Sequence, residues 1–152
     1  MECDDLLVGH WSSLPFSYGV MELSELGFLG DGRGWSVLLD VGAMWVTRFT
    51  WRCPEAGVVE LHAQWMVQGT PGQDVGPSLF SSSKPPERVD EVTRHRYGIG
   101  PAVPMPGAEA LTTVTFEEPV EFCHEFARGS TQIRPADDPT SGQTMPPWGV
   151  RP

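Results

Sequence analysis

The sequence contains four histidines and three cysteines, the side chains most often used for acid–base, nucleophilic and metal chemistry. His124 is the strongest candidate, because it lies between Phe122 and Phe126 in a segment of alternating apolar residues. Alternate residues of a strand share one face, so this pattern predicts an imidazole inside the protein, where burial tunes its pKa for general acid or base catalysis. A hydrogen-bonded interior histidine without catalytic function is the alternative. A dyad with Cys123 is excluded, since adjacent strand residues point to opposite faces.

The second candidate is the basic run Arg94-His95-Arg96-Tyr97. If Arg94 and Arg96 face inward, they could bind a substrate carboxylate through bidentate hydrogen bonds. The opposite parity places His95 and Tyr97 inside, together with Glu91. The sequence leaves both arrangements open, and we expect a solvated strand face for whichever pair points outward. Arg94 and Tyr97, one from each arrangement, are therefore candidate catalytic residues.

Other patterns do not predict a metal, phosphate or cofactor site. His10 and His62 take part in no metal-ligand spacing such as His-x-x-x-His, and no Cys-x-x-Cys pair occurs. Residues 30–34 are glycine-rich, but the Lys-Ser/Thr pair and the following helix of a phosphate-binding loop are missing. Asp137 and Asp138 are expected to be solvated. We therefore expect neither a metal nor a cofactor.

The elements that must position these residues are strands, because alternation with a period of two dominates the sequence. The Asp31-Gly32 pair predicts a hairpin, since type I′ turns need positive φ angles. We also expect a tight turn near Glu118-Pro119. The pattern predicts a single all-β domain over residues 1–128, an eight-stranded antiparallel up-and-down barrel. Its expected strands cover residues 6–12, 25–29, 34–41, 43–52, 58–67, 88–97, 110–117 and 120–128.

Three stretches rich in Pro and Gly are expected to lie outside the strands. Residues 69–87 lack periodicity and predict a flexible loop, which is either a lid that gates the barrel interior or a tolerated insertion. Residues 98–107 predict a second loop. Residues 129–152 are rich in Pro, Asp, Ser and Thr, and we expect them to form a loosely ordered C-terminal tail.

Alternation also assigns aromatic rings to the barrel interior. Within residues 43–52, the set that includes Trp45 and Phe49 faces inward, and the set that includes Arg48 faces solvent, because a slip by one residue would bury arginines. Residues 59, 61, 63, 65 and 67 are expected to share the inner face. Such rings either fill an eight-stranded barrel or enclose one small ligand. The residues predicted to contact that ligand are Trp35, Trp45, Phe49, Trp51, Trp65, Phe116, Phe122 and Phe126.

Gly9-His10-Trp11 in the first expected strand resembles the Gly-x-Trp signature of the lipocalin-like (calycin) group. In that group the Trp closes one end of the barrel against a basic side chain of the last strand, and Arg128 occupies that position here. Such a cation–π pair contributes about 0.5–2 kcal/mol. Residues 26–35 are also similar to the first hairpin of small bacterial lipocalin-like domains, whereas the stretch 69–88 is longer than that pattern. The resemblance implies binding of a small apolar molecule, or the shaping of a substrate for cyclisation or isomerisation.

Composition limits the partners. The 152 residues fit one domain and carry a net charge of −10, which argues against nucleic acids and anionic membranes. The odd number of cysteines indicates a reducing compartment, and residues 1–5 lack the pattern of a signal peptide. We expect a cytoplasmic monomer or homodimer with a small hydrophobic organic ligand. It acts either as a cofactor-independent cyclase or isomerase, or as a carrier or self-resistance protein; an acidic protein-interaction or immunity-type barrel is the third possibility.

Overall fold

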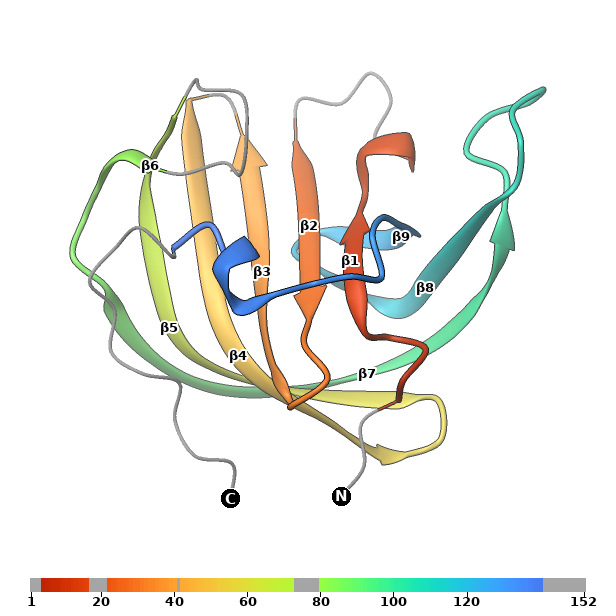
Figure 1. Ribbon diagram of the computed structural model, residues 1–152, viewed down its shortest axis with the longest axis horizontal. Helices are drawn as coiled ribbons and strands as arrows, with labels where there is room; N and C mark the ends of the chain where they lie inside the picture. The colour runs from red at the N-terminus through yellow and green to blue at the C-terminus, as the bar shows by residue number, and fades with distance from the viewer. Residues whose placement is uncertain (1–3, 17–21, 41, 73–79, 141–152) are drawn as a thin grey trace.

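The computed structural model describes residues 4–16, 22–40, 42–72 and 80–140. Strands account for most of this part of the chain (Figure 1). The strands are β1 (Gly9–Ser12), β2 (Leu23–Phe28), β3 (Arg33–Asp40), β4 (Ala43–Glu55), β5 (Val58–Pro71), β6 (Phe80–Ser83), β7 (Glu87–Ala102), β8 (Leu111–Val120) and β9 (Cys123–Arg128). Two 3-10 helices complete the description, η1 (Leu14–Phe16) and η2 (Pro135–Asp137).

Eight of these strands close into an antiparallel barrel. From β2 to β5 each strand pairs with the one before it. Strand β5 then pairs with β7, β7 with β8, β8 with β9, and β9 returns to β1. Strand β6 stands outside this ring and, among the described residues, pairs only with the end of β5. The predicted all-β up-and-down barrel is therefore confirmed, and its architecture is compatible with a lipocalin-like fold.

Several expected loops are partly strand. The stretch 69–87 contains the end of β5, the whole of β6 and the first residue of β7, while residues 73–79 of the expected gate lie outside the described residues. The expected loop 98–107 begins inside β7, whose residues 98–102 pair with β8 alone. Pro101 is tolerated there because its missing N–H can face the side without a neighbouring strand. The final hairpin turns at Glu121-Phe122 rather than at Glu118-Pro119.

A β-bulge at Gln64 reverses the alternation of β5. Arg48 of β4 pairs with Trp65 and the next residue, Phe49, pairs with Ala63, so Gln64 is the extra residue. Ala63 therefore faces the interior as expected, whereas Trp65 faces outward. There the guanidinium of Arg88 lies 5.9 Å from its ring centroid. The prediction that residues 59–67 keep one parity is wrong beyond the bulge.

The outer face of β3 and β4 is apolar and buried, which reverses a second prediction. Trp35 and Val37 pair with Arg48 and Val46, so they lie on the outer face and not in the interior. They belong to an outer cluster, distinct from the interior core. Its buried members are Leu29, Trp35, Val37, Met44, Val46, Val67 and Phe80, with Leu39 and Ile133 packed against them.

Residues 129–140, which we call the 129–140 segment, cover part of this outer face. Figure 1 shows the segment, in blue, crossing in front of β1, β2 and β3. Hydrogen bonds between the main chains of His10 and residues 129 and 130 attach its start. Near its end Asp138, which is fully buried, accepts a hydrogen bond of 2.8 Å from Nε of Arg48. In contrast to the expectations, Asp138 is not solvated and Arg48 is buried.

The interior core fills one end of the barrel. Trp11 is fully buried there, and the guanidinium carbon of Arg128 lies 4.6 Å from its ring centroid, which confirms the predicted stacked pair. The two residues are also direct partners across β1 and β9. The core comprises Leu7, Trp11, Leu26, Phe28, Phe49, Trp51, Val59, Leu61, Val114, Phe116, Val120 and Phe126.

Candidate functional site

The barrel is packed at one end and contains a hollow beyond this packed core. The hollow is a cavity of about 280 Å³ whose base is formed by Phe49, Leu61 and Val120, all members of the interior core. Its wall mixes apolar and polar side chains and includes two carboxyl groups and one imidazole. The lining residues are Ser36, Thr47, Phe49, Leu61, Ala63, Met66, Val89, Glu91, Thr93, His95, Pro119, Val120 and Glu121.

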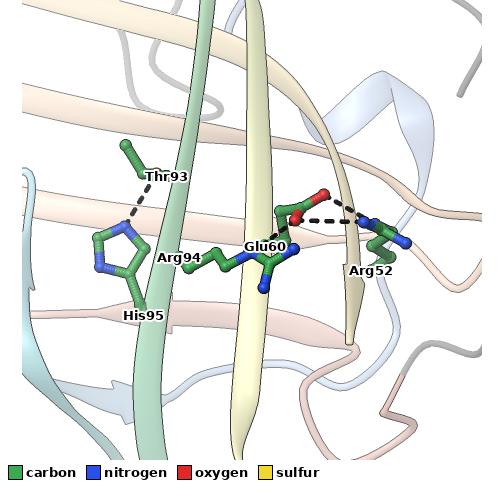
Figure 2. Close-up of polar contacts among 5 residues, drawn as sticks. All are labelled: Arg52, Glu60, Thr93, Arg94 and His95. Atoms are coloured by element: carbon green, nitrogen blue, oxygen red, sulfur yellow. Dashed lines mark hydrogen bonds and ion pairs between the residues drawn. The ribbon is translucent and has the colours of Figure 1, made fainter. Parts of the chain in front are cut away.

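Strand β7 supplies the polar wall and settles which of its residues point inward. Glu91, Thr93 and His95 line the cavity, which agrees with the arrangement that places His95 inside. Figure 2 shows His95 and Thr93 on one side of β7 and Arg94 on the other. Outside the barrel, Arg94 donates a hydrogen bond of 2.8 Å to Glu60. Arg94 is therefore not a group of this cavity.

Glu60 joins three neighbouring strands on the outer face. It lies between Arg94 of β7 and Arg52 of β4, whose Nε is 2.7 Å from Glu60 Oε1 (Figure 2). The hydrogen bond from Arg52 is the main reason that the pKa of Glu60 is lowered; burial opposes it and Arg94 adds to it. The two arginines thus neutralise one carboxylate, which is a structural arrangement rather than a carboxylate-binding site.

His95 is the most enclosed ionisable group of the cavity wall, with 9 % of its surface exposed. Its Nε2 lies 3.0 Å from Oγ1 of Thr93, while its buried Nδ1 has no hydrogen-bond partner among the described residues. Burial lowers the pKa of His95, and the nearby main chain and carboxylate of Glu118 partly oppose this. The imidazole is therefore neutral at neutral pH, with one ring nitrogen available to a bound molecule.

Glu121 reaches the cavity from a strained turn. Glu121 and Phe122 form the two-residue connection between β8 and β9, with φ angles of 49° and 67°. Side chains other than Gly, Asn and Asp rarely adopt this left-handed region, at a cost of about 1–3 kcal/mol per residue. Two serines fix the turn to the opposite wall: Ser24 Oγ donates to the carbonyl oxygen of Glu121 at 2.7 Å, and Ser36 Oγ donates to its Oε1 at 3.1 Å.

The carboxyl group of Glu121 holds a proton more readily than an exposed glutamate does. Burial is the main cause of its raised pKa, and the negative charge of Glu91 raises the pKa further. The hydrogen bond from Ser36 acts in the opposite direction. A carboxyl group in this state can donate a hydrogen bond, accept one, or transfer a proton to a bound molecule.

The predicted aromatic contacts divide into three groups. Phe49, Trp51, Phe116 and Phe126 are buried in the interior core, and only Phe49 of this set also lines the cavity. Trp45 is half-buried on the same face of β4 as Thr47. The remaining three do not face the interior: Trp35 and Trp65 lie on the outer face, and Phe122 is 75 % exposed at the strained turn. The cavity is therefore less aromatic than expected.

The other two predicted catalytic side chains do not line the cavity. His124 is exposed, and its Nδ1 lies 2.9 Å from the carbonyl oxygen of Phe116. An irregularity in β8 between residues 115 and 120 shifts the pairing with β9, so that Cys123 rather than His124 packs against the core. The prediction of an interior His124 is wrong for this reason.

Tyr97 does share the inward parity of His95 but belongs to the packed end of the barrel. Its hydroxyl group donates a hydrogen bond to the carboxylate of Asp4 and lies 3.9 Å from Sγ of Cys53. Burial is the largest cause of its strongly raised pKa, followed by the hydrogen bond with Asp4. The phenol therefore stays protonated and acts as a fixed donor.

Glu121 and Ser36 were not among the predicted site residues. A two-residue hairpin of this kind is usually signalled by Asn-Gly or Asp-Gly, and the pair Glu-Phe carries no such signal. Ser36 faces the cavity because it pairs with Thr47, which follows from a register that alternation alone did not define. The inward position of His95 was one of the two arrangements that the sequence left open.

The described residues contain no group of three or more His, Cys, Asp or Glu side chains that could hold a metal ion. They also contain no helix with the length and hydropathy needed to span a bilayer. No protein-family model matches the chain, and neither a curated protein nor a solved structure matches it.

Proposed function

We propose that this protein binds one small, mostly apolar organic molecule in the cavity inside its barrel. A cavity of about 150 Å³ is large enough for benzene, and typical ligand pockets begin near 300 Å³. The cavity of about 280 Å³ therefore suits a molecule with one ring and a short side chain. Phe49, Leu61 and Met66 offer such a ring apolar contacts.

The observation that carries the proposal is the unpartnered Nδ1 of His95 in the cavity wall, for which the described residues supply no hydrogen bond. A buried polar atom without a hydrogen bond costs about 1–3 kcal/mol, so proteins rarely leave one without a reason. A ligand with a matching polar group would recover this free energy. The same hollow disfavours a pure protein-interaction barrel, for which a filled interior is expected.

The lipocalin-like assignment and the cellular compartment are parts of the same proposal. The closed eight-stranded barrel and the stacked pair of Trp11 and Arg128 support a relationship to lipocalin-like proteins. Cys53 and Cys123 carry free thiols, which agrees with a reducing compartment such as the cytoplasm.

A cofactor-independent isomerase or cyclase is the second candidate, and one observation favours it. Burial raises the pKa of Glu121 and lowers that of His95, so a carboxyl group and a neutral imidazole face the same cavity. Such a pair can supply and remove protons while the closed wall holds the substrate in a reactive conformation. A non-catalytic carrier would use the same two groups only as hydrogen-bond partners.

A cavity-filling variant tests the binding proposal. We expect 2-phenylethanol to shift the ¹H–¹⁵N resonances of cavity residues in an NMR titration. Ala63→Leu adds bulk to the cavity wall and is expected to weaken this binding at least about tenfold, which corresponds to about 1.4 kcal/mol. Ala56→Leu, at an exposed turn position, is the matched control and should bind normally. Equal binding by both variants would contradict the proposal.

Hydrogen exchange distinguishes the catalyst from the carrier. Phenylacetone in D₂O exchanges the C–H protons beside its carbonyl group, and ¹H NMR follows the rate. Acceleration by the protein that His95→Gln abolishes supports catalysis, because the variant keeps a polar side chain but cannot act as a base. Binding without acceleration favours the carrier.

A further inference from the structure

Two carboxyl groups share the cavity without a basic side chain to neutralise them. Glu91 projects from β7, and Glu121 projects from the turn between β8 and β9. No Lys or Arg is present among the described residues that line the cavity. The repulsion between the two carboxylates contributes to the raised pKa of Glu121. The cavity is therefore electrostatically unfavourable for a negative ligand and well suited to a positive one.

The imidazole of His95 is a further polar group of the cavity wall, and one of its two ring nitrogens has no hydrogen-bond partner among the described residues. His95 is more than nine-tenths buried, and its Nδ1 has no partner among the described residues. When Nε2 donates its proton to Thr93, Nδ1 is a hydrogen-bond acceptor. Ser36 donates its hydrogen bond to Oε1 of Glu121. A bound cation favours the ionised form of Glu121, so the wall presents acceptors to such a ligand.

We propose that the cavity selects a small organic cation, a protonated amine on an apolar body, whose N–H groups bind Glu121 and His95 and whose charge is shared with Glu91. This inference rests on the proposed binding function and names its ligand class. A primary ammonium group has three donors, which match the carboxylate oxygen, the imidazole nitrogen and the second carboxylate. The apolar body lies against Phe49, Leu61 and Met66.

Three probes of similar size test the charge preference. NMR titrations at pH 7 compare 2-phenylethylamine, 2-phenylethanol and 3-phenylpropionate, which differ mainly in carrying a positive, a neutral or a negative end group. We expect the amine to bind at least about tenfold more tightly than the alcohol, because hydrogen bonds to charged groups are stronger than neutral ones. The carboxylate should bind most weakly.

Three single substitutions test whether the cavity carboxylates cause the preference for the amine. Glu121→Gln and Glu91→Gln each remove one negative charge from the cavity while keeping the side-chain volume. Both should reduce the ratio of amine to alcohol affinity, and the alcohol should still bind. Glu109→Gln removes the same charge from an exposed position outside the cavity and controls for attraction of cations by the net charge of −10. Circular dichroism and the melting temperature confirm that each variant is folded.

The outcomes separate this inference from the binding proposal. A tenfold preference for the amine that Glu121→Gln abolishes and Glu109→Gln preserves supports the inference. Equal binding of amine and alcohol, or a preference for the carboxylate, overturns the inference and leaves small-molecule binding intact. Failure of all three probes to shift cavity resonances overturns the binding proposal and this inference together.

Discussion

Replacement of Asp138 by asparagine should destabilise the protein strongly, because the fully buried Asp138 carboxylate neutralises Arg48, which is only 8 % exposed. Oδ2 of Asp138 accepts hydrogen bonds from Nε of Arg48 and from the hydroxyl group of Thr140, both at 2.8 Å. The asparagine side chain would keep the size of the original group and one acceptor oxygen. It would not keep the negative charge, so Arg48 would remain in an apolar outer cluster with its charge less well compensated.

The expected loss follows from the burial of the pair. Removing one partner of a buried ion pair costs about 3–5 kcal/mol, a large part of the roughly 5–15 kcal/mol that stabilises an ordinary domain. Detachment of the 129–140 segment sets an upper limit to the loss of unfolding free energy, because Arg48 would then reach water. In that case the loss equals the free energy that holds the segment on the barrel, and the apolar contact of Ile133 is lost as well.

Urea unfolding followed by tryptophan fluorescence and circular dichroism measures this loss. Asp137→Asn is the matched control, because Asp137 is a neighbouring carboxylate that bonds only to the exposed Arg134 among the described residues. It should cost no more than about 1 kcal/mol. Replacing both partners, as Arg48→Met with Asp138→Leu, should recover most of the stability. Equal losses for Asp138→Asn and Asp137→Asn, or a loss that disappears at a NaCl concentration of about 1 M, would refute the reasoning.

Two further predictions concern packing and pH. Gly27→Ala should destabilise the fold by about 1–3 kcal/mol in urea unfolding, because the new methyl group would lie 2.4 Å from the buried ring of Trp35. Gly30→Ala meets no atom within 4 Å, and an equal effect of the two changes would contradict this explanation. Folding raises the pKa of Glu121 above its ordinary 4.5, so its favourable contribution, complete below that pH, is lost as pH rises through the folded pKa. Glu121→Gln should therefore gain stability relative to the unaltered protein as pH rises from 4.5 through the folded pKa, and parallel stability curves would show that Glu121 titrates normally.

Local patterns in the sequence were sufficient to predict the barrel architecture. Alternation over residues 43–52 placed Phe49 and Trp51 in the interior, and the Asp31-Gly32 pair marked the first long hairpin. Both signals act over a few residues, because strand alternation and turn conformation depend on the chain itself. The stacked pair of Trp11 and Arg128 was predicted from a resemblance to a family and not from such a pattern.

Irregular pairing was not predictable in the same way. The bulge at Gln64 turns Trp65 to the outer face, and the shift between β8 and β9 exposes His124. Each irregularity is a property of two strands and their register, so neither strand alone contains it. The polar wall depends on the same registers, which explains why Glu121 was missed and His95 was only one of two possibilities.

Patterns along the chain were enough to predict the class of fold, the number of barrel strands and most of the sets of residues that share a face. These patterns did not predict that the outer face of β3 and β4 is buried too, because a segment distant in sequence covers it. Asp138 lies 90 residues after Arg48 in the chain, yet the 129–140 segment brings them together and turns an expected solvent face into an apolar layer. The physical reason is that alternation records chemical similarity along one strand, whereas burial and cavity volume depend on segments that are distant in sequence and adjacent only after folding.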